Sequence, residues 1–167
     1  STMLSESEMN TIISYANQKD IEVIPMFNAP YHVNALLSAM ENLGFSNVRK
    51  TFDSNSNYLN LESTEAVEFV KGLQKKYIEY FKGKGCKRYN FAADEYSFSN
   101  INNTLYTKFA TFVNDIAAMI IEAKMTPMAY NDGFYFDSLE SDVKFNNNIE
   151  ICYWAEDNGR ASAQTLA

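Results

Sequence analysis

Strand-like runs alternate with helical stretches along this sequence, and that alternation restricts the fold more than any other feature. Short apolar runs predict strands at residues 21–26, 88–93, 127–130 and 149–154. Amphipathic spacing predicts helices at residues 5–16, 33–43, 64–81 and 103–124. Because a helix separates successive strands, the sequence favours a parallel sheet wrapped by helices, and therefore the α/β class.

The remaining segments are expected to be loops. Residues 45–61 are polar and rich in Ser and Asn, and a second loop runs from the end of the third predicted strand to Asp142. Gly44 is expected to end the helix that precedes the first loop. The sequence shows no repeat, low-complexity tract or interdomain linker, so residues 1–167 are expected to form a single domain.

Two architectures fit such a parallel sheet, namely a doubly wound sheet or part of a (β/α)8 barrel. A closed barrel typically takes about 250 residues, more than the 167 of this chain. The sequence starts directly in a predicted helix, and residues 161–167 resemble the beginning of another. We therefore expect a partial (β/α)8 TIM barrel of about four parallel strands, forming one incomplete catalytic-barrel domain.

The charge and the cysteines restrict the partners of the chain. A formal net charge of −7 and a pI near 4.7 argue against nucleic acid and anionic membrane surfaces, whereas neutral sugars are compatible. Because no signal-peptide pattern and no apolar run of membrane-spanning length is present, no membrane insertion is expected. Cys86 and Cys152 lack metal-type spacing and are expected to be small buried hydrophobes.

Polar or aromatic side chains follow every predicted strand at its carboxyl end. These ends meet at one edge of a parallel sheet, where ligands bind. The residues are Asn28 and His32, then Asp94 and Glu95, then Tyr130, Asn131, Asp132 and Tyr135, and finally Trp154. Each has an ordinary explanation by itself, such as a structural histidine, a turn or a packed tryptophan. Their coincidence at the strand ends favours a functional site.

The acidic pair Asp94–Glu95 is the most informative of these clusters. The small residues Ala92 and Ala93 allow the backbone to tighten just before the two carboxylates. Adjacent residues leave a strand on opposite faces, so we expect one carboxylate to lie deep while its neighbour reaches the cleft. Such a pair can take different protonation states and different chemical roles.

The set of motifs resembles glycoside hydrolase family 20, the β-N-acetylhexosaminidases. The segment 5–32, with Ile21-Glu-Val-Ile-Pro25, resembles the approach to that family's Pro-Gly-His turn. FAADEYS resembles its Gly-x-Asp-Glu motif, and MAYNDGFYF and IEICYW resemble its next two strand ends. The likeness is greatest to the streptococcal cell-surface type, which has an Asn-Asp-Gly-x-Tyr-Tyr motif, and it runs over nearly the whole chain.

The resemblance implies substrate-assisted retaining catalysis without a cofactor. Glu95 is implied to be the general acid and then the base, while Asp94 orients the substrate's 2-acetamido group, whose carbonyl oxygen attacks the anomeric carbon. His32 is implied to orient Glu95. Walls of the sugar pocket are implied at Tyr130 and Trp154. The remaining substrate contacts are implied at Asn131, Asp132, Tyr135 and Asn28.

Departures from the family pattern are also visible. Tyr31 stands where Pro-Gly-His has glycine, so the turn is expected to be wider or the subsite partly filled, and Ala92 and Ala93 replace a glycine-containing pair. The family's sugar-binding arginine, its aspartate partner of the histidine, and a further tyrosine and tryptophan have no counterpart in the sequence. We therefore expect the 167 residues alone to be a poor enzyme or none.

Two other classes compete with this interpretation. A metal-dependent barrel hydrolase would gather His32, Asp94, Glu95 and Asp132 around one ion, although a single histidine is few for zinc. In a non-catalytic glycan-binding module, the aromatic loops would bind the sugar and the carboxylates would only bond hydroxyls. The expected partners are N-acetylhexosamine-containing glycans, with possible self-association through open sheet edges. The resemblance implies an extracellular or cell-surface location.

Overall fold

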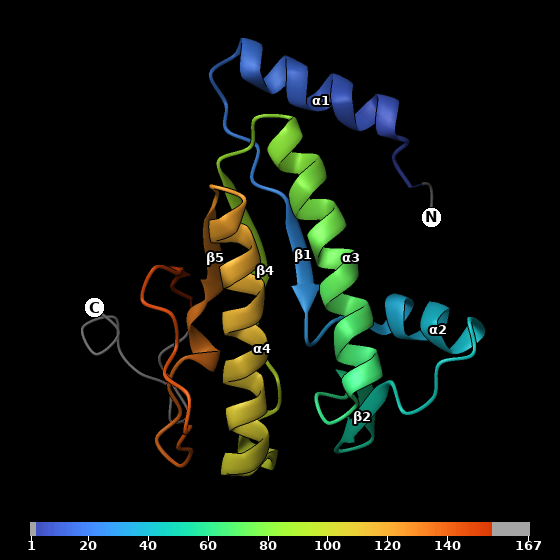
Figure 1. Ribbon diagram of the computed structural model, residues 1–167, viewed down its shortest axis with the longest axis vertical. Coiled ribbons are helices and arrows are strands. Elements are labelled where there is room, and N and C mark those ends of the chain that lie inside the picture. Colours follow the sequence, from blue (N-terminus) through green and yellow to red (C-terminus); the bar gives the residue numbers. More distant parts are fainter. Residues whose placement is uncertain (1–2, 155–167) are drawn as a thin grey trace.

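The computed structural model describes residues 3–154, which form a parallel sheet covered by helices (Figure 1). Four strands build this sheet, in the order β1-β4-β5-β6, and every neighbouring pair is parallel. They are β1 (Met26–Ala29), β4 (Arg88–Ala92), β5 (Thr126–Tyr130) and β6 (Glu150–Cys152). This arrangement confirms the predicted α/β class with a partial barrel sheet. The helix expected over 161–167 lies outside the described residues.

Within the described residues, four α-helices accompany the sheet. They are α1 (Glu6–Gln18), α2 (Asn34–Asn42), α3 (Thr64–Gly83) and α4 (Asn103–Glu122). In Figure 1, α3 and α4 run side by side along one face of the sheet, and α1 crosses the end at which the strands begin. Helix α2 lies near the other end, where the strands finish. Among residues 3–154, none of the helices is long and apolar enough to cross a membrane.

Helix α3 is fixed to the sheet by a buried polar contact within the apolar core. Gln74 is fully buried, and its amide nitrogen donates to the carbonyl oxygen of Phe27 in β1 at 3.2 Å. Its amide oxygen accepts a 2.7 Å hydrogen bond from the hydroxyl of Tyr89 in β4. Because a buried amide must be satisfied on both sides, these bonds set the position of α3 over both strands.

The first and last strands differ from their predicted ranges. Residues 21–25 are not a strand, and pairing with β4 begins at the carbonyl of Pro25, which accepts from the Asn90 N–H at 2.9 Å. Proline has no N–H to donate, and Ile21 is 60% exposed, so the apolar run before it does not enter the sheet. The last strand covers only Glu150–Cys152 of the predicted 149–154. Cys86 is buried and Cys152 half-buried, and both are free thiols.

The loop predicted for residues 45–61 is wrong, because this segment contains an antiparallel hairpin. Strand β2 (Arg49–Phe52) pairs with β3 (Asn55–Leu59). Asp53 and Ser54 form the turn with φ angles of 46° and 66°, as tight hairpin turns require. Serine is unusual at such a turn position, and a Ser- and Asn-rich composition is typical of a loop. For both reasons the sequence did not indicate the two strands.

Candidate active site

The carboxyl ends of the four parallel strands meet at one pocket, which we call the strand-end pocket. Its volume is about 580 Å³. The lining residues are Met26, Asn28, His32, Asp94, Glu95, Tyr130 and Trp154. The structure therefore brings together residues from within or just after β1, β4, β5 and β6, as parallel strand ends require.

His32 and the acidic pair form the polar centre of the strand-end pocket. The His32 Nε2 atom lies 2.9 Å from Glu95 Oε2 and 3.9 Å from Asp94 Oδ2. The side chain of Asp94 is 16% exposed, whereas those of Glu95 and His32 are 40% and 41% exposed. One carboxylate thus lies deep and its neighbour reaches the cleft, the division of depth that the sequence predicted.

The cause of that division is not strand alternation, because β4 ends before the carboxylates. Ala92, Ala93 and Glu95 have φ angles of 62°, 58° and 53°, so the chain turns through left-handed conformations. The Asn90 side chain supports the turn by accepting the Ala92 N–H at 2.8 Å. Left-handed backbone is costly for residues with a Cβ, and such strain is concentrated at functional sites.

The environment of Asp94 favours its protonated form more than water does. Burial raises the pKa of Asp94 above its ordinary value, and the nearby carboxylates of Asp132 and Glu95 act in the same direction. A backbone hydrogen bond and the neighbouring His32 oppose this change in pKa. The protonation state of Asp94 therefore depends on Asp132, Glu95 and His32 as well as on its burial.

Asp132 lies behind the strand-end pocket and connects two of its walls. Its side chain is fully buried, and Oδ2 accepts the Glu95 backbone N–H at 2.7 Å. Its Oδ1 accepts the indole N–H of Trp154 at 3.1 Å. The neighbouring Asn131, 1% exposed, accepts the Trp154 backbone N–H through Oδ1 at 2.8 Å. Asn131 and Asp132 therefore hold Glu95 and Trp154 of the pocket wall by hydrogen bonds from the protein interior.

Gly133 allows the turn after β5 to approach the turn after β4. A Cβ at this position would lie 2.6 Å from Phe109 Cζ and 2.9 Å from the Ala93 carbonyl oxygen. The Tyr106 hydroxyl donates to the Gly133 carbonyl at 3.1 Å and holds the segment against α4. The Asn-Asp-Gly motif therefore forms a turn and also allows the segments after β4 and β5 to pack closely.

Of the other residues predicted for the site, some line the strand-end pocket and one does not. Asn28 and Tyr130 line the strand-end pocket, and the Tyr130 hydroxyl lies 3.8 Å from the Met26 sulfur. Trp154 is 49% exposed at the pocket wall. Tyr135 is 42% exposed on the loop beyond β5 and is not among the residues that line the pocket.

Glu95 also lines a second pocket, which we call the hairpin-side pocket. It has a volume of about 370 Å³ and is lined by Tyr31, Tyr58, Glu95, Ser97, Phe98, Ser99 and Phe136. The sequence analysis did not include these residues apart from Glu95, although it noted Tyr31 as a departure from the family motif. Tyr58 belongs to the hairpin that was predicted to be a loop, which is why this wall was missed.

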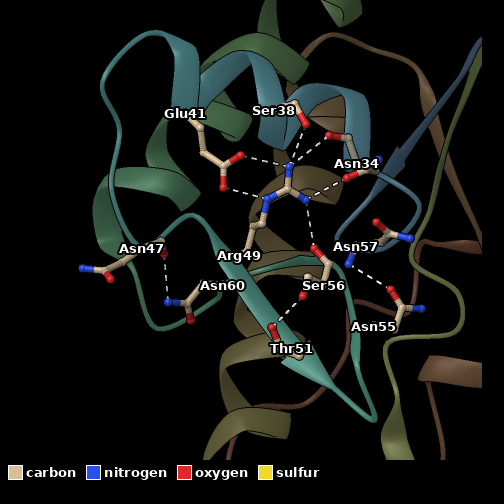
Figure 2. A network of polar contacts seen from close by, with 10 residues as sticks. All are labelled: Asn34, Ser38, Glu41, Asn47, Arg49, Thr51, Asn55, Ser56, Asn57 and Asn60. Carbon is tan, nitrogen blue, oxygen red and sulfur yellow. Dashed lines mark hydrogen bonds and ion pairs between the residues drawn. The ribbon is translucent and has the colours of Figure 1, made fainter.

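Arg49 fixes the hairpin to helix α2 (Figure 2). Its Nε and Nη2 atoms contact the two carboxylate oxygens of Glu41 at 2.7 and 3.0 Å. Its other contacts are with Asn34 Oδ1 at 2.8 Å, Ser38 Oγ at 2.8 Å and the Ser56 carbonyl at 3.0 Å. Because these bonds use both ends of the planar guanidinium, the hairpin has a defined position against the helix.

The same centre must also be considered as a metal site. His32, Asp94 and Glu95 each offer a ligand atom, and these atoms lie within 4.8 Å of one another. One imidazole and two carboxylates are a chemically suitable set for a divalent ion. Asp132, the fourth candidate ligand, has both carboxylate oxygens engaged by the Glu95 and Trp154 N–H groups.

Comparison with protein-family models finds a family that matches the whole chain. A model described as the catalytic domain of glycosyl hydrolase family 20 matches residues 1–167. A lacto-N-biosidase of Bifidobacterium bifidum is 27% identical in an alignment that covers 90% of this chain and 14% of that protein.

Solved structures show the same fold. One of the catalytic modules of the pneumococcal exo-β-D-N-acetylglucosaminidase StrH superposes with a TM-score of 0.90 and 39% identity, covering 99% of this chain and 43% of that one. Dispersin B, at 21% identity, superposes with a TM-score of 0.77 over 98% of this chain and 50% of its own, and shows the fold alone. The chain thus spans 14% of the biosidase and less than half of the StrH chain.

Proposed function

This chain belongs to glycoside hydrolase family 20, and from that premise we propose that it carries the acid/base centre of an enzyme that removes terminal N-acetylhexosamine from glycans. The observation that supports this proposal best is the geometry around Glu95. Its carboxyl group is hydrogen-bonded to His32, adjoins the deep Asp94, and faces a pocket walled by Tyr130 and Trp154. The pocket volume of 580 Å³ falls within the range of roughly 300–1,000 Å³ usual for small ligands.

In the proposed mechanism, the first step breaks the glycosidic bond. Glu95 gives its proton to the glycosidic oxygen, and the leaving sugar departs as an alcohol. The carbonyl oxygen of the substrate's own 2-acetamido group attacks the anomeric carbon and forms an oxazolinium ion. Asp94 accepts a hydrogen bond from the acetamido N–H and stabilises the positive charge that develops there. Its 16% exposure favours this role because a charge interaction weakens when water screens it.

The second step returns the enzyme to its starting state. A water molecule attacks the anomeric carbon, and Glu95, now a carboxylate, accepts its proton. The bond to the acetamido oxygen breaks, and the sugar leaves with its original anomeric configuration because two inversions have occurred. His32 holds the Glu95 carboxyl at 2.9 Å through both steps and thereby fixes the direction of proton transfer.

The aromatic walls supply sugar binding in this proposal. Tyr130 and Trp154 present ring faces to the acetamido methyl group and the sugar, and the buried Asp132 fixes the Trp154 indole. We propose that Asn28 bonds a hydroxyl at the rim, while Asn131 and Asp132 act through Trp154 and Glu95. An exposed Tyr135 would contact substrate only beyond the strand-end pocket.

The test is release of p-nitrophenol from its β-N-acetylglucosaminide by the complete natural polypeptide that contains residues 1–167. Glu95→Gln should reduce kcat by about 10²–10⁴-fold, the usual contribution of a general acid, while sugar binding persists. The matched control is Glu65→Gln, which removes a carboxylate from the exposed start of α3 and should have no effect. Absence of activity in the unaltered polypeptide, with sugar binding intact, would favour the glycan-binding alternative.

A metal-dependent hydrolase is the second candidate, because three ligand atoms lie within 4.8 Å. A chelator separates the two mechanisms. Substrate-assisted hydrolysis should be unchanged after exhaustive treatment with EDTA, whereas a metal enzyme should lose its rate and regain it with added zinc, calcium or magnesium. The expectation that residues 1–167 alone are inactive is checked in the same assay.

A further inference from the structure

Tyr31 lies between the histidine of the strand-end pocket and the hairpin. The centroid of its ring is 3.9 Å from that of His32, at an interplanar angle of 39°, and 4.3 Å from that of Tyr58, at 15°. Both faces of the Tyr31 ring are thus covered by protein side chains. We propose that Tyr31 is a positioning residue, which holds the His32 ring in the orientation that bonds Glu95. This rests on the proposed function, in which Glu95 is the general acid.

The backbone at His32 brings the two neighbouring rings together. Side chains of adjacent residues in extended backbone point to opposite sides. His32 has a φ of 59°, so the chain leaves extended geometry there, and the imidazole lies against the Tyr31 ring. In this orientation its Nε2 atom is 2.9 Å from Glu95 Oε2. Because left-handed backbone is costly for a residue with a Cβ, contacts in the surrounding structure must favour it.

The Tyr58 ring gives the stack a fixed base. Tyr58 is buried, and its ring makes an edge contact with that of Tyr96, with centroids 5.7 Å apart. The hydroxyl of Tyr31 accepts a 2.9 Å hydrogen bond from Asn55 Nδ2. These contacts restrict the rotamers of the stacked tyrosines, so the imidazole packs against a rigid surface.

Hydrogen bonds connect the hairpin to both turns of the acid/base centre. The Leu59 N–H donates to the carbonyl of Pro30, in the turn after β1, at 2.8 Å. The Leu59 carbonyl accepts a 2.7 Å bond from the hydroxyl of Tyr96, the residue after Glu95. Arg49 in turn fixes the hairpin to α2 (Figure 2). The hairpin is thus bonded to the turn that carries the histidine and to the turn that carries the acid.

The reaction itself distinguishes a positioning role from a purely structural one. A methyl glycoside loses a strongly basic leaving group and depends on the proton of the general acid, whereas 2,4-dinitrophenolate is a weak base and leaves with little help. A residue that positions the acid therefore affects the methyl glycoside more. A residue that only stabilises the fold affects both substrates equally.

The experiment compares kcat/KM for the methyl and 2,4-dinitrophenyl β-N-acetylglucosaminides in the complete natural polypeptide. Tyr31→Ala should lower the value for the methyl glycoside about tenfold, the upper size of a lost ring contact, and that for the dinitrophenyl glycoside less than about twofold. Tyr31→Phe keeps the ring and should restore most of the loss. Tyr31→Leu fills much of the same volume without a flat ring, should behave as Tyr31→Ala does, and serves if that variant does not fold. Tyr15→Ala, 62% exposed on α1, is the matched control.

A double-mutant cycle tests whether Tyr31 acts through the histidine. In a His32→Ala background, Tyr31→Ala should lower kcat/KM for the methyl glycoside by less than about twofold, because the contact that it removes is already absent. In the unaltered background the same substitution should have its full effect.

The outcomes distinguish this proposal from the one on which it rests. If the Tyr31→Ala and Tyr31→Leu variants lose the same factor with both substrates, or if the loss persists in full without His32, the inference is overturned and the proposed function stands. If the unaltered polypeptide hydrolyses neither substrate, the proposed function fails and this inference fails with it.

Discussion

The strand-end pocket and the hairpin-side pocket share Glu95 but are built in different ways. The strand-end pocket takes its residues from the ends of β1, β4, β5 and β6, which the parallel sheet brings together. The hairpin-side pocket takes Tyr58 from β3 and other residues from the turns after β1 and β4. The first resembles its family in sequence, whereas the second contains Tyr31, where the family motif has glycine.

The difference indicates separate structural roles for the two pockets around Glu95, the proposed general acid. Hydrogen bonds between strand ends fix groups that must be placed precisely, such as the 2.7 Å bond from the Glu95 N–H to Asp132. Turns and a hairpin carry the contacts that are free to vary between related proteins. If the division holds, changes on the strand-end side should lower the rate of hydrolysis more than changes on the hairpin side.

Asp94→Asn should produce the largest effect on the strand-end side. The amide cannot stabilise the developing charge on the acetamido group, so kcat/KM should fall about 10²–10³-fold, as when one stabilising group is removed. The loss should be the same for the methyl β-N-acetylglucosaminide and for N-acetylglucosamine β1,4-linked to glucose, because in the proposed mechanism Asp94 acts on the acetamido group and not on the leaving group. A loss confined to one of the two substrates would break the comparison between the pockets. Asp137→Asn, an exposed carboxylate beyond β5, is the control.

Asp132→Asn should have a smaller effect on the same side. The substituted amide can accept at only one oxygen, so either the Glu95 N–H or the Trp154 indole N–H loses its partner. A buried unsatisfied donor predicts a decrease in kcat of about ten- to hundredfold, with a smaller change in KM. The measurement is steady-state kinetics at a temperature where the variant is fully folded. A change in thermal stability alone, with kcat within twofold, would show that Asp132 does not position the acid.

Arg49→Met should affect the hairpin side. It removes the contacts with Glu41, Asn34 and Ser38, and charge-assisted hydrogen bonds of this kind predict a loss of about 1–3 kcal/mol in the free energy of unfolding. Hydrolysis should decrease less than it does in Asp94→Asn, because none of the described contacts of Arg49 is with a residue of the strand-end pocket. Chemical denaturation and steady-state kinetics measure the two effects. Arg88→Met, at a 42% exposed arginine with ion pairs of 3.4 and 3.5 Å, should cost less than about 1 kcal/mol.

The smallest expected effect is the pH dependence of stability at Asp94. Burial raises the pKa of Asp94 above its ordinary 3.8, so the folded state binds this proton more tightly than the unfolded state. The stability gained from that proton is present below pH 3.8 and is lost as the pH rises through the folded pKa. Asp94→Asn should therefore raise the melting temperature at neutral pH, and the difference should shrink as the pH falls toward 3. A difference that is constant from pH 3 to 8 would contradict this explanation.

The sequence by itself determined the α/β class and indicated the place of the candidate site. Apolar runs and amphipathic stretches alternate because strands and helices have periods of two and 3.6 residues, and these periods can be read locally. A parallel sheet places every strand end at the same edge, so residues such as His32, Asp94 and Trp154 could be grouped before their distances were known.

Only the tertiary structure decided how those groups face one another. The left-handed turn at Ala92 and Ala93, the burial of Asp132, and the hairpin that holds Tyr58 all depend on contacts between distant segments. Glu95 and Asp132 are 37 residues apart, and their hydrogen bond requires the register of β4 against β5 and the absence of a Cβ at Gly133. Local periodicity gives the face on which a residue lies, but register and close packing follow from the whole fold.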